Sequence, residues 1–151
     1  MKRLVFDTGP FLLLFTSEAG SDKVRKAVLK HENGEIRIYM HPNNLAEAYK
    51  VMSRIIKEKQ GTARNVKPEQ VVRSAYATFS VVYDAETTIK LGMLKLKYGE
   101  KPWGDLSSAA LSLRLSEESP TPVVVLDNEK HFEDIKEVSI IRVSELDEIL
   151  E

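Results

Sequence analysis

Short apolar runs alternate with helically spaced segments along the whole chain, and this alternation constrains the fold more than any other feature. The clearest run, Val123 to Leu126, is continuous and mostly β-branched, and it stands between Pro122 and Asp127. A run of this kind is typical of a strand buried on both faces. Strands that alternate with helices pair in parallel, with helices on both faces of the sheet. We therefore predict an α/β fold with a five-stranded parallel sheet flanked by helices.

Element boundaries follow from turn residues and from the spacing of apolar residues. Helices show apolar residues three or four positions apart, with Asn-Gly, Pro or Asp near their ends. The predicted strands are residues 4–6, 36–40, 80–83, 123–126 and 138–143. The predicted helices are residues 11–15, 21–31, 44–60, 68–79, 85–98, 105–117 and 144–150, with a loop over residues 61–67.

Length and composition favour one intracellular domain. A chain of 151 residues buries enough apolar surface for a single core, so we predict one domain over residues 1–151. Because there is no cysteine and only three histidines, a bound metal would be held mainly through oxygen. Asp7, Gly9 and Pro10 interrupt the apolar stretch near the N-terminus, which leaves it too short for a signal peptide or a membrane span. We expect a soluble, cytoplasmic protein.

Acidic residues lie where the predicted strands end. Asp7 directly follows the first strand, and Asp127 and Glu129 follow the fourth. Glu47 lies early in the helix after the second strand, and Asp105 begins the helix that precedes the fourth strand. Ligands of parallel sheets bind beyond the carboxyl ends of the strands. We therefore expect these acids to converge at that edge of the sheet.

Each acid also has a purely local interpretation. Asp7 and Asp127 suit turns, and Asp105 suits a helix N-cap. Glu47, three residues after Asn44, suits a capping box. Converging carboxylates, however, repel one another, because two unit charges roughly 4 Å apart interact by about 4 kcal/mol at an effective dielectric of about 20. A hard cation with oxygen ligands offsets that repulsion, and we predict a site for Mg²⁺ or Mn²⁺.

Basic residues gather in the segment from Lys50 to Arg73. Such clusters contact phosphates in nucleic-acid-binding proteins, although lysine-rich helix faces are often simply solvated. Trp103 and Tyr49 suit stacking on a base, but we expect both to pack in the core. The candidate RNA contacts are Arg54, Lys57, Arg64, Lys67 and Arg73.

Several segments, in this order, resemble the motifs of the PIN-domain nucleases. They are Asp7-Thr8-Gly9 after the first strand, Asn44-Leu45-Ala46-Glu47, Trp103 to Leu111, and Val125 to Phe132. Each motif is short, but their order and their placement on the predicted elements span almost the whole chain. The resemblance implies a PIN-like fold and a metal-dependent endoribonuclease, and VapC-type toxins are the most similar members.

The resemblance also implies roles for individual residues. Asp7, Glu47 and Asp105 match the first three acids of the family. Thr8 matches a frequent hydroxyl position, where it would orient Asp7 or a metal-bound water.

The fourth acidic position departs from the family pattern. Counting back from Phe132, Glu129 stands where the family usually has Asp. Asp127 stands where the family usually has Thr or Ser, so either residue is a candidate for the fourth acid. We interpret His131 as a turn residue of the same motif with no part in the chemistry.

The resemblance extends to partners. It implies RNA as the substrate, and we hypothesise hydrolysis that leaves 5′-phosphate and 3′-hydroxyl ends. An antitoxin protein normally inhibits VapC-type toxins, and family members commonly form homodimers, so both are expected here. The alternatives are an RNA-processing nuclease outside a toxin–antitoxin pair and a PIN-fold module that binds RNA or protein with weak or no chemistry. The irregular fourth acid motivates the module.

Overall fold

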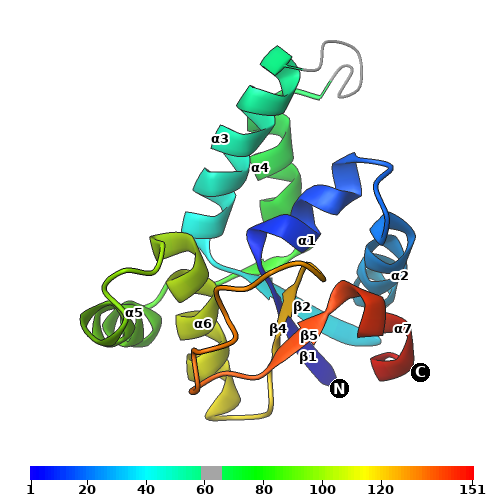
Figure 1. Cartoon of the computed structure of the whole chain (residues 1–151). Coiled ribbons are helices and arrows are strands. Elements are labelled where there is room, and N and C mark those ends of the chain that lie inside the picture. Colours follow the sequence, from blue (N-terminus) through cyan, green and yellow to red (C-terminus); the bar gives the residue numbers. More distant parts are fainter. Residues whose placement is uncertain (59–65) are drawn as a thin grey trace.

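Five parallel strands form one sheet, in the order β3-β2-β1-β4-β5, in a computed structural model that describes residues 1–58 and 66–151 (Figure 1). The side chains of residues 56–58 also lie outside the description. The strands are β1 (Lys2–Phe6), β2 (Ile36–Met40), β3 (Ser80–Val81), β4 (Val123–Val125) and β5 (Ile140–Arg142). Every pairing is parallel, so the carboxyl ends of the strands share one edge. The predicted fold class is confirmed.

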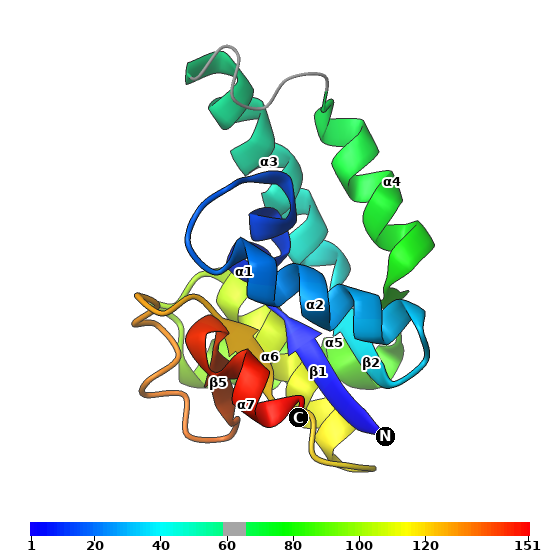
Figure 2. The same ribbon diagram turned by 90° about the vertical axis from the view of Figure 1, so that its right-hand side faces the viewer.

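Helices cover both faces of this sheet (Figures 1 and 2). They are α1 (Thr8–Leu12), α2 (Ser21–Glu32), α3 (Pro42–Glu58), α4 (Pro68–Thr78), α5 (Ala85–Lys97), α6 (Trp103–Ser116) and α7 (Leu146–Ile149), with short 3₁₀ helices η1 (Leu13–Phe15) and η2 (Val143–Glu145). In both views α3 and α4 lie side by side and project together beyond the sheet. None of the helices that the structure describes is long and apolar enough to cross a membrane.

The alternation of side chains along the strands produces two hydrophobic cores. Leu4 and Phe6 of β1 join the core that contains residues of α2, α3, α4 and α7. Val5 joins the other core, together with Val123 and Val125 of β4 and residues of α5 and α6. Because successive side chains of a strand face opposite sides, the residue after Phe6 faces the α6 side. That residue is Asp7.

Several predicted boundaries differ from the structure, and the differences come from caps and turns. The helix predicted from residue 44 begins at Pro42, a residue suited to the first turn of a helix, and its predicted end at Gln60 lies outside the described residues. The strand predicted over 80–83 has only two residues, and the predicted final helix is divided between η2 and α7. The helix predicted from Asp105 begins two residues earlier, at Trp103.

Candidate metal centre

Asp7 is the first residue after β1, and its carboxylate is buried between α3 and α6. Its backbone is still extended, so the side chain keeps to the α6 side of the sheet. Asn44 Nδ2 of α3 and Ser108 Oγ of α6 both donate hydrogen bonds to Asp7 Oδ1, over 3.1 and 2.8 Å. Only 5% of Asp7 is exposed. A strand and two helices therefore fix this carboxylate in place.

Asn44 connects the groups around Asp7. Its fully buried amide nitrogen also lies 3.1 Å from Thr8 Oγ1 and 3.0 Å from the carbonyl oxygen of Gly104. One amide has two N–H groups, so three acceptors share them. Asn44 Oδ1 has no hydrogen-bond partner among the described residues. Sequence analysis gave Asn44 only a capping role and missed its contact with Asp7, although a polar residue four positions before Ala48, on the apolar face of α3, could have indicated a buried role.

Glu47 enters from α3, and its carboxylate lies directly against Gly104 of α6. A Cβ atom at position 104 would stand 3.2 Å from Glu47 Cδ and closer still to Oε2. Glycine therefore leaves the room that the carboxylate occupies. The capping-box interpretation of Glu47 is wrong, because α3 begins at Pro42 and Asn44 lies inside the helix with its amide directed at Asp7.

Asp105, Glu129 and His131 also meet here. Each offers one ligand atom, and the three atoms lie within 4.8 Å of one another. Asp105 is the third residue of α6, whose N-cap is Pro102, so its interpretation as an N-cap is wrong. Glu129 and His131 belong to the loop between β4 and β5. Sequence reasoning assigned His131 no role, because spacing alone does not show where the ring of a loop residue points.

Asp7, Glu47, Asp105 and Glu129, termed the acidic cluster below, influence one another's charge. The pKa of Asp7 is raised to about 8, first by desolvation and then by the charges of Asp105 and Glu129. Desolvation also raises the pKa of Asp105 to about 6, with further contributions from the charges of Glu129 and Glu47. Carboxylates that shift one another in this way are close and poorly screened by water. A cation among them would favour their charged forms.

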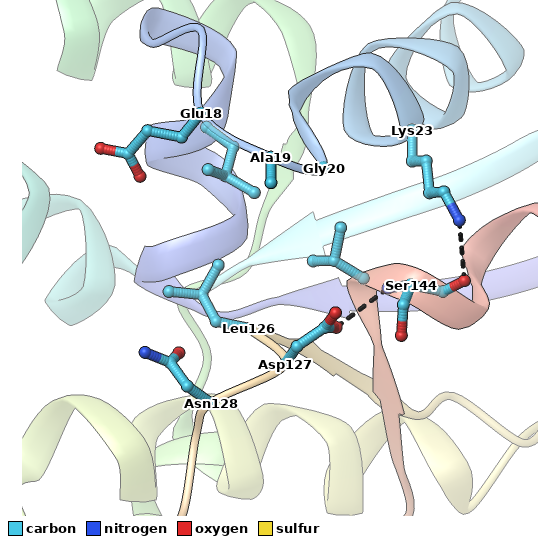
Figure 3. Close-up of a pocket in the computed structure, with 10 residues that line it drawn as sticks. Glu18, Ala19, Gly20, Lys23, Leu126, Asp127, Asn128 and Ser144 are labelled. Carbon is cyan, nitrogen blue, oxygen red and sulfur yellow. Dashed lines mark hydrogen bonds between the residues drawn. The ribbon is translucent and has the colours of Figure 1, made fainter.

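Asp127 points toward Ser144 and is hydrogen-bonded to it (Figure 3). Ser144 N donates to Asp127 Oδ1 over 3.0 Å, and the exposed Asp127 lines a pocket with residues of α2 and η2. A turn follows β4, in which Glu129 N donates to the carbonyl oxygen of Leu126 over 3.1 Å. This turn ends the alternation of side chains along β4. As a result, Glu129 and not Asp127 lies beside Asp105.

The donor set fits a divalent cation. Carboxylate oxygens from separate segments surround one region, with a single imidazole at its edge. Hard cations such as Mg²⁺ and Mn²⁺ prefer such oxygen ligands. Desolvation and, after it, charge repulsion raise the pKa values of Asp7 and Asp105, and the positive charge of a cation would offset both by favouring the ionised carboxylates.

The candidate RNA-contacting residues are only partly described. Arg54 on α3, Lys67 before α4 and Arg73 on α4 are all exposed. Arg64 and the side chain of Lys57 lie outside the described residues. The expectation that Trp103 and Tyr49 pack in the core is wrong, because their exposed fractions are 54% and 41%. Trp103 lies under the ammonium group of Lys95, and Tyr49 donates a hydrogen bond to Glu69.

Comparison with known proteins gives a consistent result for the fold. A sequence model of the PIN domain matches residues 4–138. A search of curated proteins by sequence gave no significant match.

Two solved structures are similar over nearly their full length. A chain of the VapBC2 complex from Rickettsia felis, crystallised with a DNA fragment from their promoter, superposes with a TM-score of 0.63 at 15% identity, and the match covers 92% of this chain and 97% of that one. A chain of a toxin–antitoxin complex from Klebsiella pneumoniae superposes with a TM-score of 0.58 at 19% identity, covering 93% of this chain and 97% of that one. At these identities the likeness concerns the fold.

Proposed function

Because the chain belongs to the PIN domain family of nucleases, we propose that it is a divalent-metal-dependent endoribonuclease that hydrolyses RNA phosphodiester bonds. The observation that carries the proposal is the convergence of the acidic cluster from separate segments of the chain onto one desolvated region. Carboxylates in that arrangement repel, and their placement is otherwise costly. A bound Mg²⁺ or Mn²⁺ would offset that repulsion.

The residues of the acidic cluster would hold the ion, and each is positioned by a different neighbour. Asp7 is oriented by Asn44 and Ser108, and Thr8 stays beside it through its own contacts with Asn44. Glu47 is seated against Gly104. A divalent ion in such a site supplies an activated water and neutralises charge on the phosphate under attack. The fixed carboxylates would orient that ion without reorganising during the reaction.

We assign the fourth acidic role to Glu129 and none to Asp127. The charge of Glu129 acts on both Asp7 and Asp105, whereas Asp127 accepts a hydrogen bond from Ser144 N on the other side of the loop. Arg142 supports the loop, because its guanidinium donates to the carbonyl oxygens of Leu126 and Glu129 over 3.0 and 2.6 Å.

RNA would approach along the projecting α3–α4 pair. Exposed Arg54 lies two turns beyond Glu47 on α3, and Lys67 and Arg73 are exposed on the neighbouring segment. Contacts between these cations and backbone phosphates would make binding weaken steeply with salt. Arg64 and Lys57 are kept in this proposal on sequence grounds alone.

We further propose that the chain is the toxin of a toxin–antitoxin pair, acting in the cytoplasm as a homodimer and inhibited by an antitoxin protein. The support is the similarity of its fold to chains of the Rickettsia felis and Klebsiella pneumoniae complexes. A second candidate is a binding module of the same fold without chemistry, which is favoured by the glutamate at position 129 in place of the family's usual aspartate.

The test is cleavage of a mixed RNA pool by the purified protein in Mg²⁺ or Mn²⁺. An EDTA reaction is the first control, and the Asp7→Asn variant, which removes a charge but little volume, is the second. We expect cleavage that requires both the metal and Asp7, with 5′-phosphate ends on the products. Equal cleavage by the Asp7→Asn variant would show that the acidic cluster is not the active site. RNA binding without metal-dependent cleavage would favour the binding module.

A further inference from the structure

We propose that His131 adds a nitrogen ligand to the site, so that the protein binds late transition-metal ions such as Co²⁺ more tightly than an all-oxygen site would. The inference rests on the proposed function, since it concerns the ion held by the acidic cluster. It assigns this chain a metal preference that its four carboxylates alone would not produce.

The first support is the geometry of the His131 ring. One of its nitrogens lies within 4.8 Å of a carboxylate oxygen of Asp105 and of Glu129, and those two oxygens also lie within 4.8 Å of each other. Ligand atoms that share one metal ion lie at mutual distances of this order.

The second support is the way in which the backbone of His131 is held. His131 N donates to Glu129 Oε1 over 2.7 Å, so the same residue also orients the glutamate. The carbonyl oxygen of His131 accepts a hydrogen bond from Lys101 Nζ over 2.7 Å. Lys101 is only 7% exposed, and Phe132, the next residue after the histidine, is 2% exposed in the α6-side core. The ring is therefore presented from a fixed backbone although its own side chain is exposed.

The third support is the state of the other two histidines. His31 uses both ring nitrogens, since Ile38 N donates to Nδ1 and Nε2 lies 2.6 Å from the carbonyl oxygen of Thr78. His41 is 7% exposed and accepts a hydrogen bond from Asn43 N. With three histidines and no cysteine in the chain, an imidazole-dependent metal affinity points to His131.

Ligand chemistry gives the expected preference. Mg²⁺ strongly favours oxygen ligands and keeps several waters, so it gains little from an imidazole. Affinity for nitrogen-containing sites rises along the series from Mn²⁺ through Co²⁺ to Ni²⁺. Removal of the His131 ring should therefore weaken Co²⁺ binding much more than Mg²⁺ binding.

The experiment measures Co²⁺ and Mg²⁺ dissociation constants by calorimetry for the untagged protein, the His131→Ala variant and the Lys130→Ala variant. Lys130 is an exposed neighbour in the same loop, so its variant controls for general disturbance of the loop. We expect His131→Ala to weaken Co²⁺ binding by about tenfold or more, because loss of even a residue that only supports a metal ligand typically costs about 10- to 100-fold in affinity, with little change for Mg²⁺. In imidazole NMR spectra, Co²⁺ should perturb the His131 signals far more than those of His31 and His41.

Each other outcome overturns the proposal in a distinguishable way. If His131→Ala binds Co²⁺ as the parent does, or loses Co²⁺ and Mg²⁺ affinity equally, His131 is no ligand or serves only to position the loop. The metal site itself would then still stand, provided that binding depends on Asp105. If the parent protein binds neither ion, both this inference and the proposed metal-dependent function fail.

Discussion

β1 and β4 are neighbouring parallel strands, each followed closely by an aspartate, yet only one of the two aspartates lies in the acidic cluster. Asp7 is buried and accepts hydrogen bonds from two helices, whereas Asp127 is exposed and accepts one from Ser144 N. After β1 the chain enters α1 at once, but after β4 it makes a turn and a loop. An acid just after a strand therefore inherits the side-chain alternation of the strand only while its own backbone stays extended, as at Asp7, and not where it lies in a turn, as at Asp127.

The two sides of the site also differ in how they are built. The β1 side is assembled from packed helices, with Asn44, Gly104 and Ser108 in contact with the acids. The β4 side is a loop held by Lys101 and Arg142. We therefore expect substitutions on the helix-built side to be less tolerated than those on the loop-built side.

The largest effect is expected for Gly104→Ala on the helix-built side. The new Cβ would displace the Glu47 carboxylate, and misplacement of a catalytic group by about 1 Å can cost roughly 100-fold in rate. Stability should change little, because the displaced atoms end a flexible side chain and alanine favours helix by about 1 kcal/mol over glycine. Cleavage rates and thermal unfolding, measured together, check this prediction.

Gly92→Ala is the matched control, since a Cβ added at that position in α5 would meet no described atom within 4 Å beyond its own stretch of helix backbone. It should raise stability slightly and leave cleavage unchanged. If Gly104→Ala cleaves RNA like Gly92→Ala, the close seating of Glu47 has no importance for the reaction.

The next largest effect on the cleavage rate is expected on the loop-built side, where Glu129→Gln is compared with Asp127→Asn. Glu129→Gln removes a charge from the acidic cluster and should lower cleavage by about 10- to 100-fold, the range typical of substitutions that weaken a metal site. Asp127→Asn keeps an oxygen acceptor for Ser144 N and should stay within about twofold of the parent, because it touches no group in the cluster. Cleavage assays at a fixed Mn²⁺ concentration decide between the two, and the reverse order would make Asp127 the fourth acid.

A smaller effect on the rate, with a clear effect on stability, is expected for Asn44→Ala. Asp7 Oδ1 and the carbonyl oxygen of Gly104 would lose a buried donor, at a cost of about 1–3 kcal/mol in the free energy of unfolding. Asn43→Ala, which removes one hydrogen bond from an exposed side chain to Ser107, should cost well under that. Denaturant unfolding measures both free energies of unfolding. Equal losses for the two variants would show that the buried hydrogen bonds of Asn44 add no more stability than the exposed hydrogen bond of Asn43.

The smallest effect is a pH dependence of thermal stability. In the presence of a chelator, the raised pKa values mean that the folded chain retains protons on Asp7 and Asp105 that the unfolded chain has released. Their contribution to stability is therefore complete below the unfolded pKa of 3.8 and is lost as the pH rises through about 6 and about 8. Mn²⁺ binds the deprotonated carboxylates, so it should raise the melting temperature by a few degrees more at about pH 8.5 than at about pH 5.5. An equal rise at both pH values would contradict this linkage.

Patterns in the sequence are enough to predict the parallel α/β architecture and, from it, the approach of Asp7, Glu47 and Asp105 to one edge of the sheet. Both follow from local patterns: apolar runs and helical spacing define the elements, and their alternation fixes which ends share an edge. Asp7 is the clearest case, because it directly follows Phe6 and inherits the side-chain alternation of β1.

The sequence left the choice between Glu129 and Asp127 open, and it did not indicate that His131 lies beside the acids or that Asn44 and Gly104 contact them. These features depend on a turn after β4 and on contacts between elements far apart in the chain, such as the approach of α3 to α6. Local spacing carries no information about such approaches, because they are set by how whole helices pack on the sheet.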